Sequence, residues 1–134
     1  MTKYKSPPVG NNISFIFNGL NPGIFYEPKT LEEILKRGLK EDNLHVLDWF
    51  TTNFNDGASY CGYTMLVPLS ESHLSVHTYR EHNSIAFGIY SCLSPSSGMK
   101  TYRRALKELK PKNHILFRNI MPVTLREIEK CKKR

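Results

Sequence analysis

The sequence is poor in cysteine and has no long apolar run. These shortages argue against a disulfide-linked protein and against a membrane-spanning one. The three cysteines are Cys61, Cys92 and Cys131. An odd number without paired spacing predicts no disulfide framework and fits thiols that stay reduced in the cytosol. No segment reaches the length of a membrane span, and residues 1–12 lack the apolar core of a signal peptide. We therefore expect a cytoplasmic protein without a membrane anchor.

Metal ligands and nucleic-acid-binding features are also scarce. His45, His82 and His114 lie far apart, without the spacing typical of a metal site. The net charge is +7, but five of the basic residues fall within residues 126–134, where a solvated tail explains them. That tail and residues 102–104 are the only support for a basic module that binds a polyanion. We expect neither a metal nor a nucleic-acid partner.

What the sequence does contain is enough apolar material for one folded domain. Of its 134 residues, 40% are hydrophobic and 11% are aromatic, which is typical of a folded chain rather than a disordered one. This length supports one core but not two. No internal repeat or low-complexity tract divides the chain. We therefore expect a single domain over residues 1–134.

Alternating apolar residues and turn residues predict a sheet with few helices. Strands are predicted over residues 13–20, 44–54, 59–69, 70–79, 84–92 and 113–120. Four successive strands with short connections favour an antiparallel sheet. Helices should pack on one face of it, so the predicted fold class is α+β, a two-layer sandwich.

Three helices are predicted around these strands. The first begins with a capping box, in which Thr30 is the N-cap residue and Glu33 reaches back to it. Its apolar stripe consists of Leu31, Ile34, Leu35 and Leu39. The second helix covers residues 99–110, and a short third one begins at Thr124.

The strand predicted over residues 70–79 has an unusual pattern. Leu74 and Val76 fall on one face. The other face carries a polar row of Ser75, His77 and Tyr79. A histidine in such a row needs a polar neighbour or a pocket. An ordinary strand with satisfied hydroxyl groups would also explain the pattern.

Ser72, at the start of this strand, can react with its own backbone. A serine hydroxyl is a weak nucleophile unless a base or a strained geometry assists it. Attack on the carbonyl of the peptide bond between Glu71 and Ser72, an N→O acyl shift, makes an ester. β-Elimination of that ester cuts the chain and leaves a pyruvoyl group at the new amino terminus. This ketone can form a Schiff base with an amine and act as an electron sink.

The residues around Ser72 resemble the self-processing segment of a known family. Glu71-Ser72-His73, an alternating strand, and His77 followed by threonine and an aromatic residue form the pattern of the small prokaryotic S-adenosylmethionine decarboxylases, which depend on a pyruvoyl group. Cys92 lies twenty residues after Ser72, the spacing of that family's proton donor. The resemblance covers most of the chain in length and element order, and it is strongest over residues 62–92.

This resemblance implies that the chain cuts itself between residues 71 and 72 into a beta chain, 1–71, and an alpha chain, 72–134. The cofactor is then the pyruvoyl group formed from Ser72, with no metal and no pyridoxal phosphate. By the same resemblance, His77 removes the proton during β-elimination, and Cys92 is the general acid that returns a proton to the product carbanion. From the residues alone, His77 could instead be a structural histidine and Cys92 a small buried apolar side chain.

Three further site residues follow from the resemblance. Glu71 supplies the carbonyl of the bond that is cut. Thr64 stands where the family has a serine that helps processing and catalysis; packing in the core is the alternative. Glu81 matches the acid that binds the ribose hydroxyls of the substrate, because a carboxylate can accept two hydrogen bonds from a diol. A surface glutamate beside a turn is the alternative for Glu81.

One position departs from the family in a way that bears on the substrate. The aromatic residue that stacks on adenine in the family falls on Ala58. A nearby ring could substitute, since a ring face suits both a purine and a sulfonium cation. The candidates are Phe54, Tyr60 and Tyr63.

The function implied by the resemblance is decarboxylation of S-adenosylmethionine, a small-molecule substrate, which supplies the aminopropyl donor for spermidine biosynthesis. It also implies a homodimer of cleaved protomers with sites near the interface. A decarboxylase of the same family that acts on arginine or another basic amino acid is the first alternative. A catalytically inactive homologue that serves as a regulatory partner subunit is the second.

Overall fold

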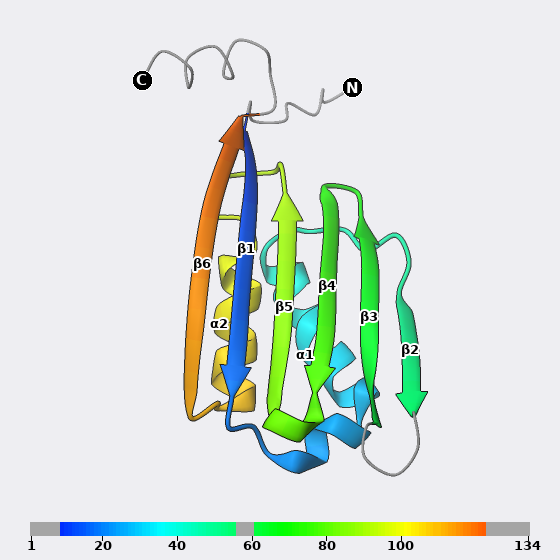
Figure 1. The fold of residues 1–134 in the computed structure, drawn as a ribbon. Coiled ribbons are helices and arrows are strands. Elements are labelled where there is room, and N and C mark those ends of the chain that lie inside the picture. Colours follow the sequence, from blue (N-terminus) through cyan, green and yellow to red (C-terminus); the bar gives the residue numbers. More distant parts are fainter. Residues whose placement is uncertain (1–8, 56–60, 123–134) are drawn as a thin grey trace.

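Six strands form one antiparallel sheet in the computed structural model, which describes residues 9–55 and 61–122. The strands are β1 (Val9–Asn18), β2 (Phe50–Asn55), β3 (Cys61–Leu69), β4 (Ser72–Tyr79), β5 (Ser84–Ser91) and β6 (Asn113–Pro122). Their order across the sheet is β2-β3-β4-β5-β1-β6. Figure 1 shows two helices, α1 (Pro28–Glu41) and α2 (Met99–Leu109), on the same side of this sheet. The predicted α+β two-layer sandwich is confirmed.

Two short 3₁₀ helices complete the connections. The first, η1 (Pro22–Tyr26), follows β1, and Asn21 accepts a hydrogen bond from the Gly23 N–H at its start. The second, η2 (Arg80–His82), joins β4 to β5 and ends at Asn83, which adopts the left-handed conformation with φ +51°. Asparagine tolerates this conformation better than most residues, so the predicted turn at this place has a clear local cause.

The helix α1 begins two residues before the predicted N-cap, so the predicted capping box at Thr30 and Glu33 is wrong. Its first residue is Pro28, and Glu27 is the N-cap residue. Proline suits the first helical position because its missing N–H has no intrahelical partner there. The Thr30 hydroxyl instead donates to Glu27 Oε2 at 3.3 Å. The predicted apolar stripe is confirmed, because all of its members are buried: Leu31, Ile34, Leu35 and Leu39.

The segment between α1 and β2 also differs from the prediction. Alternation predicts a strand from residue 44, but β2 begins only at Phe50. Residues 44–47 lie against the end of β3 instead, where Val46 forms an isolated bridge with Leu69. Further on, the Asp48 carboxylate accepts the Trp49 N–H at 2.8 Å, which removes that donor from any strand ladder.

The two helices approach closely at a glycine. A Cβ atom on Gly38 would lie 2.7 Å from the Cα atom of Thr101, so no larger residue fits there without a shift. Asp42, which follows α1, accepts hydrogen bonds from the Thr101 N–H and from the Thr101 hydroxyl, both at 2.7 Å. Asp42 thereby satisfies orphan donors at the start of α2. These contacts hold the helices together as one layer.

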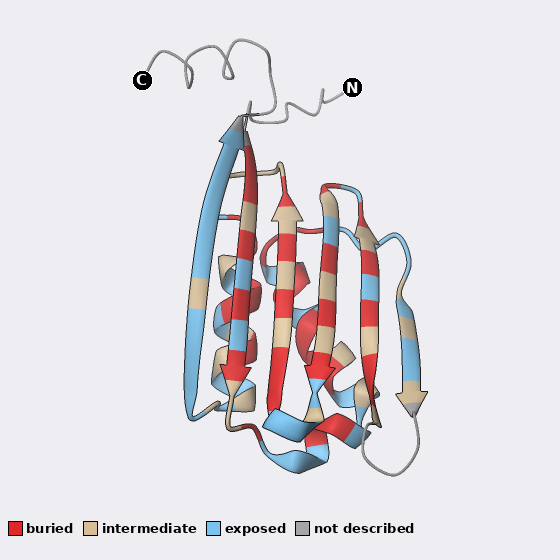
Figure 2. Ribbon diagram, viewed as in Figure 1, coloured by how far each residue is buried: buried red, intermediate tan, exposed pale blue. Residues whose placement is uncertain are grey.

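The hydrophobic core lies between the helices and the sheet. Buried residues alternate with less buried ones along β3, β4 and β5, as Figure 2 shows. Tyr63 belongs to this core, since it is 1% exposed and its hydroxyl donates to the Ile24 carbonyl at 2.7 Å. Burial raises the pKa of the Tyr63 hydroxyl, which therefore remains a donor. An aromatic cluster fills the centre of the core: Phe15, Phe17, Phe87 and Tyr102.

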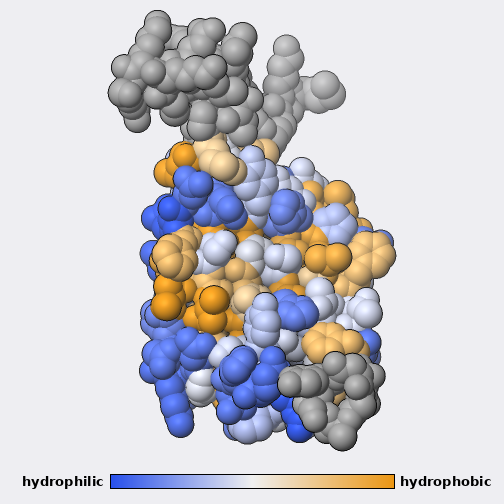
Figure 3. Space-filling model, viewed as in Figure 1, coloured by the Kyte–Doolittle hydropathy of each residue, from blue (hydrophilic) through white to orange (hydrophobic). Residues whose placement is uncertain are grey.

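The side of the sheet away from the helices, called the open face below, carries two cross-strand rows of residues. The first row runs through Phe50, Leu66, Ser75, Gly88, Ser14 and Phe117. The second row runs through Thr52, Thr64, His77, Ala86, Ile16 and Ile115. Apolar side chains gather over β6 and β1 on this face (Figure 3), and those of Ile16, Ile115 and Phe117 are exposed.

Some sequence predictions lie outside the described residues. These are the short helix from Thr124, Cys131, the basic tail at 126–134, and the positions Ala58 and Tyr60. Within residues 9–55 and 61–122, no helix has both the length and the apolar composition needed to cross a bilayer.

Candidate active site

The bond between Glu71 and Ser72 lies in the turn between β3 and β4, at one end of the sheet. Ser72 has φ +150°, a backbone conformation that residues with a side chain rarely adopt. Such a conformation costs on the order of 1–3 kcal/mol and persists only where the surrounding structure holds it. Strain is one of the conditions that can make a serine hydroxyl reactive toward its own backbone.

Cys92 holds the carbonyl group of this strained bond. Ser72 pairs with Ser91 across β4 and β5, which brings the next residue, Cys92, beside the turn. The Cys92 N–H donates to the Glu71 carbonyl oxygen at 3.2 Å, and the Cys92 thiol donates to the same oxygen with Sγ at 3.5 Å. Two donors on one carbonyl oxygen stabilise the negative charge that develops there when a nucleophile attacks.

The Glu71 side chain is held separately, by His45. It is 6% exposed, and Oε1 accepts the His45 backbone N–H at 2.8 Å. Its Oε2 lies 2.9 Å from His45 Nδ1, which is the donor when the carboxylate is ionised. The sequence pattern did not identify His45. It lies 26 residues before Glu71, and only the folding of residues 44–47 onto β3 brings the two together.

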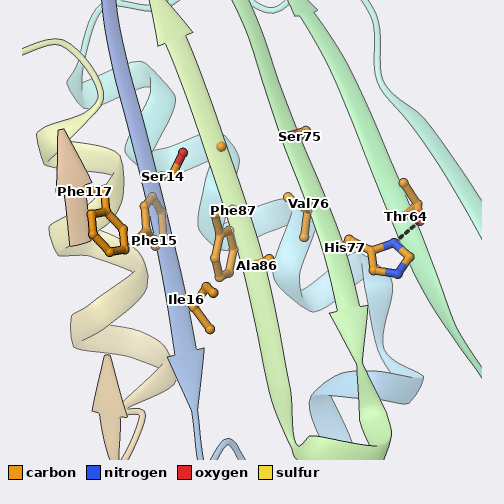
Figure 4. A pocket seen from close by; sticks show the side chains of 11 residues that line it. Ser14, Phe15, Ile16, Thr64, Ser75, Val76, His77, Ala86, Phe87 and Phe117 are labelled. Atoms are coloured by element: carbon orange, nitrogen blue, oxygen red, sulfur yellow. Dashed lines mark hydrogen bonds between the residues drawn. The ribbon is translucent and has the colours of Figure 1, made fainter. Parts of the chain in front are cut away.

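Thr64 and His77 form a pair at the middle of the open face. They are cross-strand partners of β3 and β4, and the Thr64 hydroxyl lies 2.7 Å from His77 Nδ1 (Figure 4). The Phe54 ring stacks on the imidazole at 5.6 Å between centroids, and Tyr79 meets its edge at 4.9 Å. Among the aromatic candidates, Phe54 therefore lies on this face. Tyr63 was a wrong candidate, because its ring is enclosed in the core.

A cavity of about 340 Å³ opens beside this pair on the open face. The side chains at its centre are short, since Ser14, Ser75 and Gly88 are neighbours in the first cross-strand row. A Cβ atom on Gly88 would lie 3.0 Å from Ser75 Oγ, so the glycine keeps this hollow open. Figure 4 shows His77 at one side of the hollow and Phe117 at the other.

A second cavity, of about 600 Å³, lies between the Glu71 turn and the start of α2. Glu71 and His45 line it together with three cationic side chains: Lys100, Arg103 and Arg118. Within the described residues, none of these three forms an ion pair with a carboxylate. The carboxylates of Glu41 and Asp42 line the same cavity, so charged groups of both signs lie next to the strained bond.

The structure does not bring all the predicted site residues together within one chain. Ser72 shares its side of β4 with Leu74, whereas His77 projects from the open face. Five residues also separate them along the strand, about 17 Å at 3.3 Å per residue. Glu81 is exposed in η2, beyond the opposite end of β4 from Ser72. The predicted residues thus form three separate places: the strained turn, the Thr64–His77 pair, and Glu81.

No group of three or more His, Cys, Asp or Glu residues in the described part of the chain is arranged to hold a metal ion. The resemblance implies a prosthetic group made from the chain itself, at Ser72. The strained backbone of Ser72 and the two donors on the preceding carbonyl fit such an origin.

Comparison with known sequences gives a consistent result. The family model described as S-adenosylmethionine decarboxylase matches residues 13–119. The S-adenosylmethionine decarboxylase proenzyme of Sulfolobus acidocaldarius is 31% identical over 67% of this chain and 70% of its own length. The arginine decarboxylase proenzyme of Pyrobaculum arsenaticum is 23% identical over 83% of each chain.

A solved structure has the same fold. The adenosylmethionine decarboxylase from Aquifex aeolicus superposes with a TM-score of 0.76 and is 23% identical in sequence. The match covers 89% of this chain and 95% of that one. The sheet and helix layers described above are thus those of a known fold.

Proposed function

The chain belongs to the S-adenosylmethionine decarboxylase family, and on that premise we propose that it is a pyruvoyl-dependent decarboxylase that cuts itself between Glu71 and Ser72. The observation that carries this proposal is the geometry of that bond. Ser72 is strained at φ +150°, and the preceding carbonyl oxygen accepts a hydrogen bond from the Cys92 N–H at 3.2 Å. Both features favour attack by the Ser72 hydroxyl.

Self-cleavage would proceed in two stages at this bond. In the first, Ser72 Oγ attacks the Glu71 carbonyl carbon, the Ser72 nitrogen leaves as an amine, and an ester links the two residues. In the second, a base removes the Ser72 α-proton, the Cβ–Oγ bond breaks, and Glu71 departs as an α-carboxylate. The dehydroalanine that remains tautomerises and loses ammonia to water, which leaves the pyruvoyl ketone. The Cys92 donors stabilise the negative charge that develops on the Glu71 oxygen during the first stage.

We assign the base to His77, as the resemblance implies. A base that acts through Nε2 must carry its proton on Nδ1, and Thr64 Oγ1 is in position to accept that proton in a hydrogen bond at 2.7 Å. Thr64 therefore holds the direction of the ring and can accept the Nδ1 proton that this role requires. The methyl group that distinguishes threonine from serine leaves this hydrogen bond intact.

The separation of His77 from Ser72 favours a site built from two copies of the chain. The open face carries exposed apolar side chains at Leu66, Ile115 and Phe117, which a second copy would bury. Two chains related by a two-fold axis would then carry their sites near this interface, as the resemblance implies. The proposed enzyme is thus a cytoplasmic homodimer of cleaved protomers.

The proposed substrate is S-adenosylmethionine. The pyruvoyl ketone supplies an electron sink for the bond to the leaving carboxylate, and Cys92, beside Ser72, returns a proton to the α-carbon. Glu81 would accept the two ribose hydroxyls, and Phe54 offers a ring face on the open side of the sheet. The product would be the aminopropyl donor for spermidine biosynthesis.

Arginine is the second candidate substrate. The relative from Pyrobaculum arsenaticum carries the name arginine decarboxylase proenzyme, and Ala58 stands where an adenine-stacking ring is expected. Arginine has neither a purine nor a diol, so it needs no ring at that position. Glu81 would then pair with the guanidinium group.

The test of the proposal is the intact mass of the purified protein under denaturing conditions. We expect two fragments, 1–71 and 72–134, the second blocked to Edman degradation by its ketone. Ser72→Ala should remain a single chain. A wild-type protein that stays uncut after long incubation contradicts the pyruvoyl mechanism and favours an inactive regulatory homologue.

The substrate is tested with the cleaved protein. Labelled carbon dioxide should be released from carboxyl-labelled S-adenosylmethionine. Release from labelled arginine alone would change the substrate and leave the self-cleavage chemistry intact. In either case, Cys92→Ala should slow turnover more than it slows cleavage. The thiol that the substitution removes returns the proton to the product carbanion.

A further inference from the structure

A segment outside residues 62–92, where the resemblance is strongest, holds the turn that contains the strained bond. Residues 44–47 run beside the end of β3, and two backbone hydrogen bonds join them to it and to the residue that follows it. The His45 carbonyl accepts the Ser70 N–H at 2.9 Å, and the Leu47 N–H donates to the Pro68 carbonyl at 2.9 Å. The segment is therefore fixed to the chain immediately before Glu71.

His45 and Glu71 differ in exposure, and the difference shows which of the two side chains needs the contact. The His45 side chain is 73% exposed, whereas the Glu71 carboxylate is 6% exposed. A buried carboxylate is stable only when its oxygens are hydrogen-bonded. Both oxygens bond to His45, one through the backbone N–H and the other through Nδ1. His45 contributes little to the core and holds a group that is buried in the turn.

Glu71 is thus fixed at two points. Its carboxylate is bound to His45, and its carbonyl oxygen is bound to the Cys92 N–H on the other side of the turn. The next residue, Ser72, has the strained φ of +150°. Strain of this kind relaxes unless the neighbouring groups are held in place. Rotation of the peptide group between Glu71 and Ser72 would relax it, and the two anchors resist that rotation.

We propose that His45 is a positioning residue for self-cleavage, which holds the Glu71 carboxylate so that the bond between Glu71 and Ser72 stays strained and open to attack. This role rests on the proposed function, because it has no meaning in a chain that is not cut. His45 touches none of the reacting atoms. It acts through Glu71, and its effect falls on the first stage of cleavage.

Three substitutions at position 45 separate this role from a general loss of stability. His45→Ala removes the Nδ1 donor and should slow the appearance of the two fragments about tenfold, the effect of losing one hydrogen bond to a charged group. His45→Asn places an amide nitrogen near the position of Nδ1 and should cleave within about twofold of wild type. His45→Gln carries its amide one bond farther out and should behave like His45→Ala.

Two controls accompany these variants. His82→Ala removes an exposed histidine of η2, beyond the opposite end of β4 from the turn, and should cleave at the wild-type rate. Each substitution is also made with Ser72→Ala, and the melting temperatures of these uncut proteins report folding alone. A rate that falls in His45→Ala and recovers in His45→Asn, at similar melting temperatures, supports positioning.

The outcomes distinguish this proposal from the function on which it rests. An uncut wild-type protein contradicts both. A cleaved wild type together with a folded His45→Ala that cleaves equally fast overturns the role of His45 and leaves the proposed function standing. If His45→Ala does not fold, the Asn and Gln variants decide, and equal rates in those two overturn the role as well.

Discussion

The two sides of β4 have different surroundings, although their residues alternate along one strand. Leu74 and Val76 are each 1% exposed and lie under the helices. Ser75 and His77 are half-buried on the open face, where His77 has the Thr64 hydroxyl as its partner. The covered side is mostly apolar, and its buried Thr78 hydroxyl is satisfied by the Tyr63 backbone, whereas the open side has polar groups within reach of solvent. One step along this strand therefore moves a side chain from the core to the open face.

The shapes of the two faces differ in the same way. On the covered face, the rings of Phe15 and Phe87, from the neighbouring strands β1 and β5, stack at 4.6 Å between centroids. On the open face, Ser75 and Gly88 are cross-strand neighbours, and a cavity of about 340 Å³ lies above them. A filled face resists change, whereas a hollow face with exposed apolar edges accepts a ligand or a second chain.

The largest effect should come from the open face. We expect His77→Ala to slow self-cleavage about 10²- to 10⁴-fold, the usual contribution of a positioned general base. The rate is measured from the appearance of the two fragments by mass under denaturing conditions. Thr64→Ser should keep most of the rate, because it keeps the hydroxyl beside Nδ1, whereas Thr64→Val should lose much of it. Normal cleavage in a folded His77→Ala would remove this difference between the faces.

The covered face should show its effect in stability. Leu74→Ala should lower the free energy of unfolding by about 2–5 kcal/mol, the cost of a cavity in a packed core. The matched variant is Ser75→Ala, one residue along, which should change it by less than about 0.5 kcal/mol. Both are measured by urea unfolding with Ser72→Ala in place, so that cleavage does not interfere. Equal losses in the two variants would mean that the open face is also part of the core.

The exposed edge of the open face should affect association more than stability. Phe117 is 66% exposed on β6, and Phe117→Ser should weaken dimer formation about tenfold, as truncation of an interface aromatic does. Sedimentation equilibrium measures the dissociation constant. The control is Leu47→Ser, which removes an equally exposed side chain in the segment 44–47. A dimer that tolerates Phe117→Ser as well as Leu47→Ser does not use this edge.

The smallest effect should come from Glu81, which lies on neither face but beyond the end of β4. In the cleaved protein, Glu81→Gln should raise KM for S-adenosylmethionine roughly threefold, because an amide is a weaker acceptor for a diol than a carboxylate. We expect little change in kcat and none in the rate of cleavage. Steady-state rates of carbon dioxide release give both constants. An unchanged KM would leave Glu81 as a surface residue.

The fold could be read from the sequence wherever one local rule decided the outcome. Alternation located β4 and β5 to within two residues at either end, and the apolar stripe of α1 was complete. The errors arose where two local rules competed. Pro28 rather than Thr30 set the start of α1, and residues 44–47 lie against the end of β3, so the strand predicted from residue 44 begins only at Phe50.

The candidate site was only partly readable, because distance in the sequence does not give distance in space. The neighbours Thr64 and His77 lie 13 residues apart and meet because β3 and β4 form a hairpin. The contact of His45 with Glu71 has no such local cause. Alternation also implied that Ser72 and His77 project to opposite sides of one strand, but no pattern in the sequence measures what lies between them.

The order of the strands determines what remains after a cut between Glu71 and Ser72. One fragment would contain β1, β2 and β3, and the other would contain β4, β5 and β6. In the sheet, β1 lies between β5 and β6, and β3 pairs with β4. The two pieces are thus interlaced: a strand of the first piece is enclosed on both edges by strands of the second. Cutting the backbone here opens the chain without opening the sheet, and the halves can separate only by unfolding.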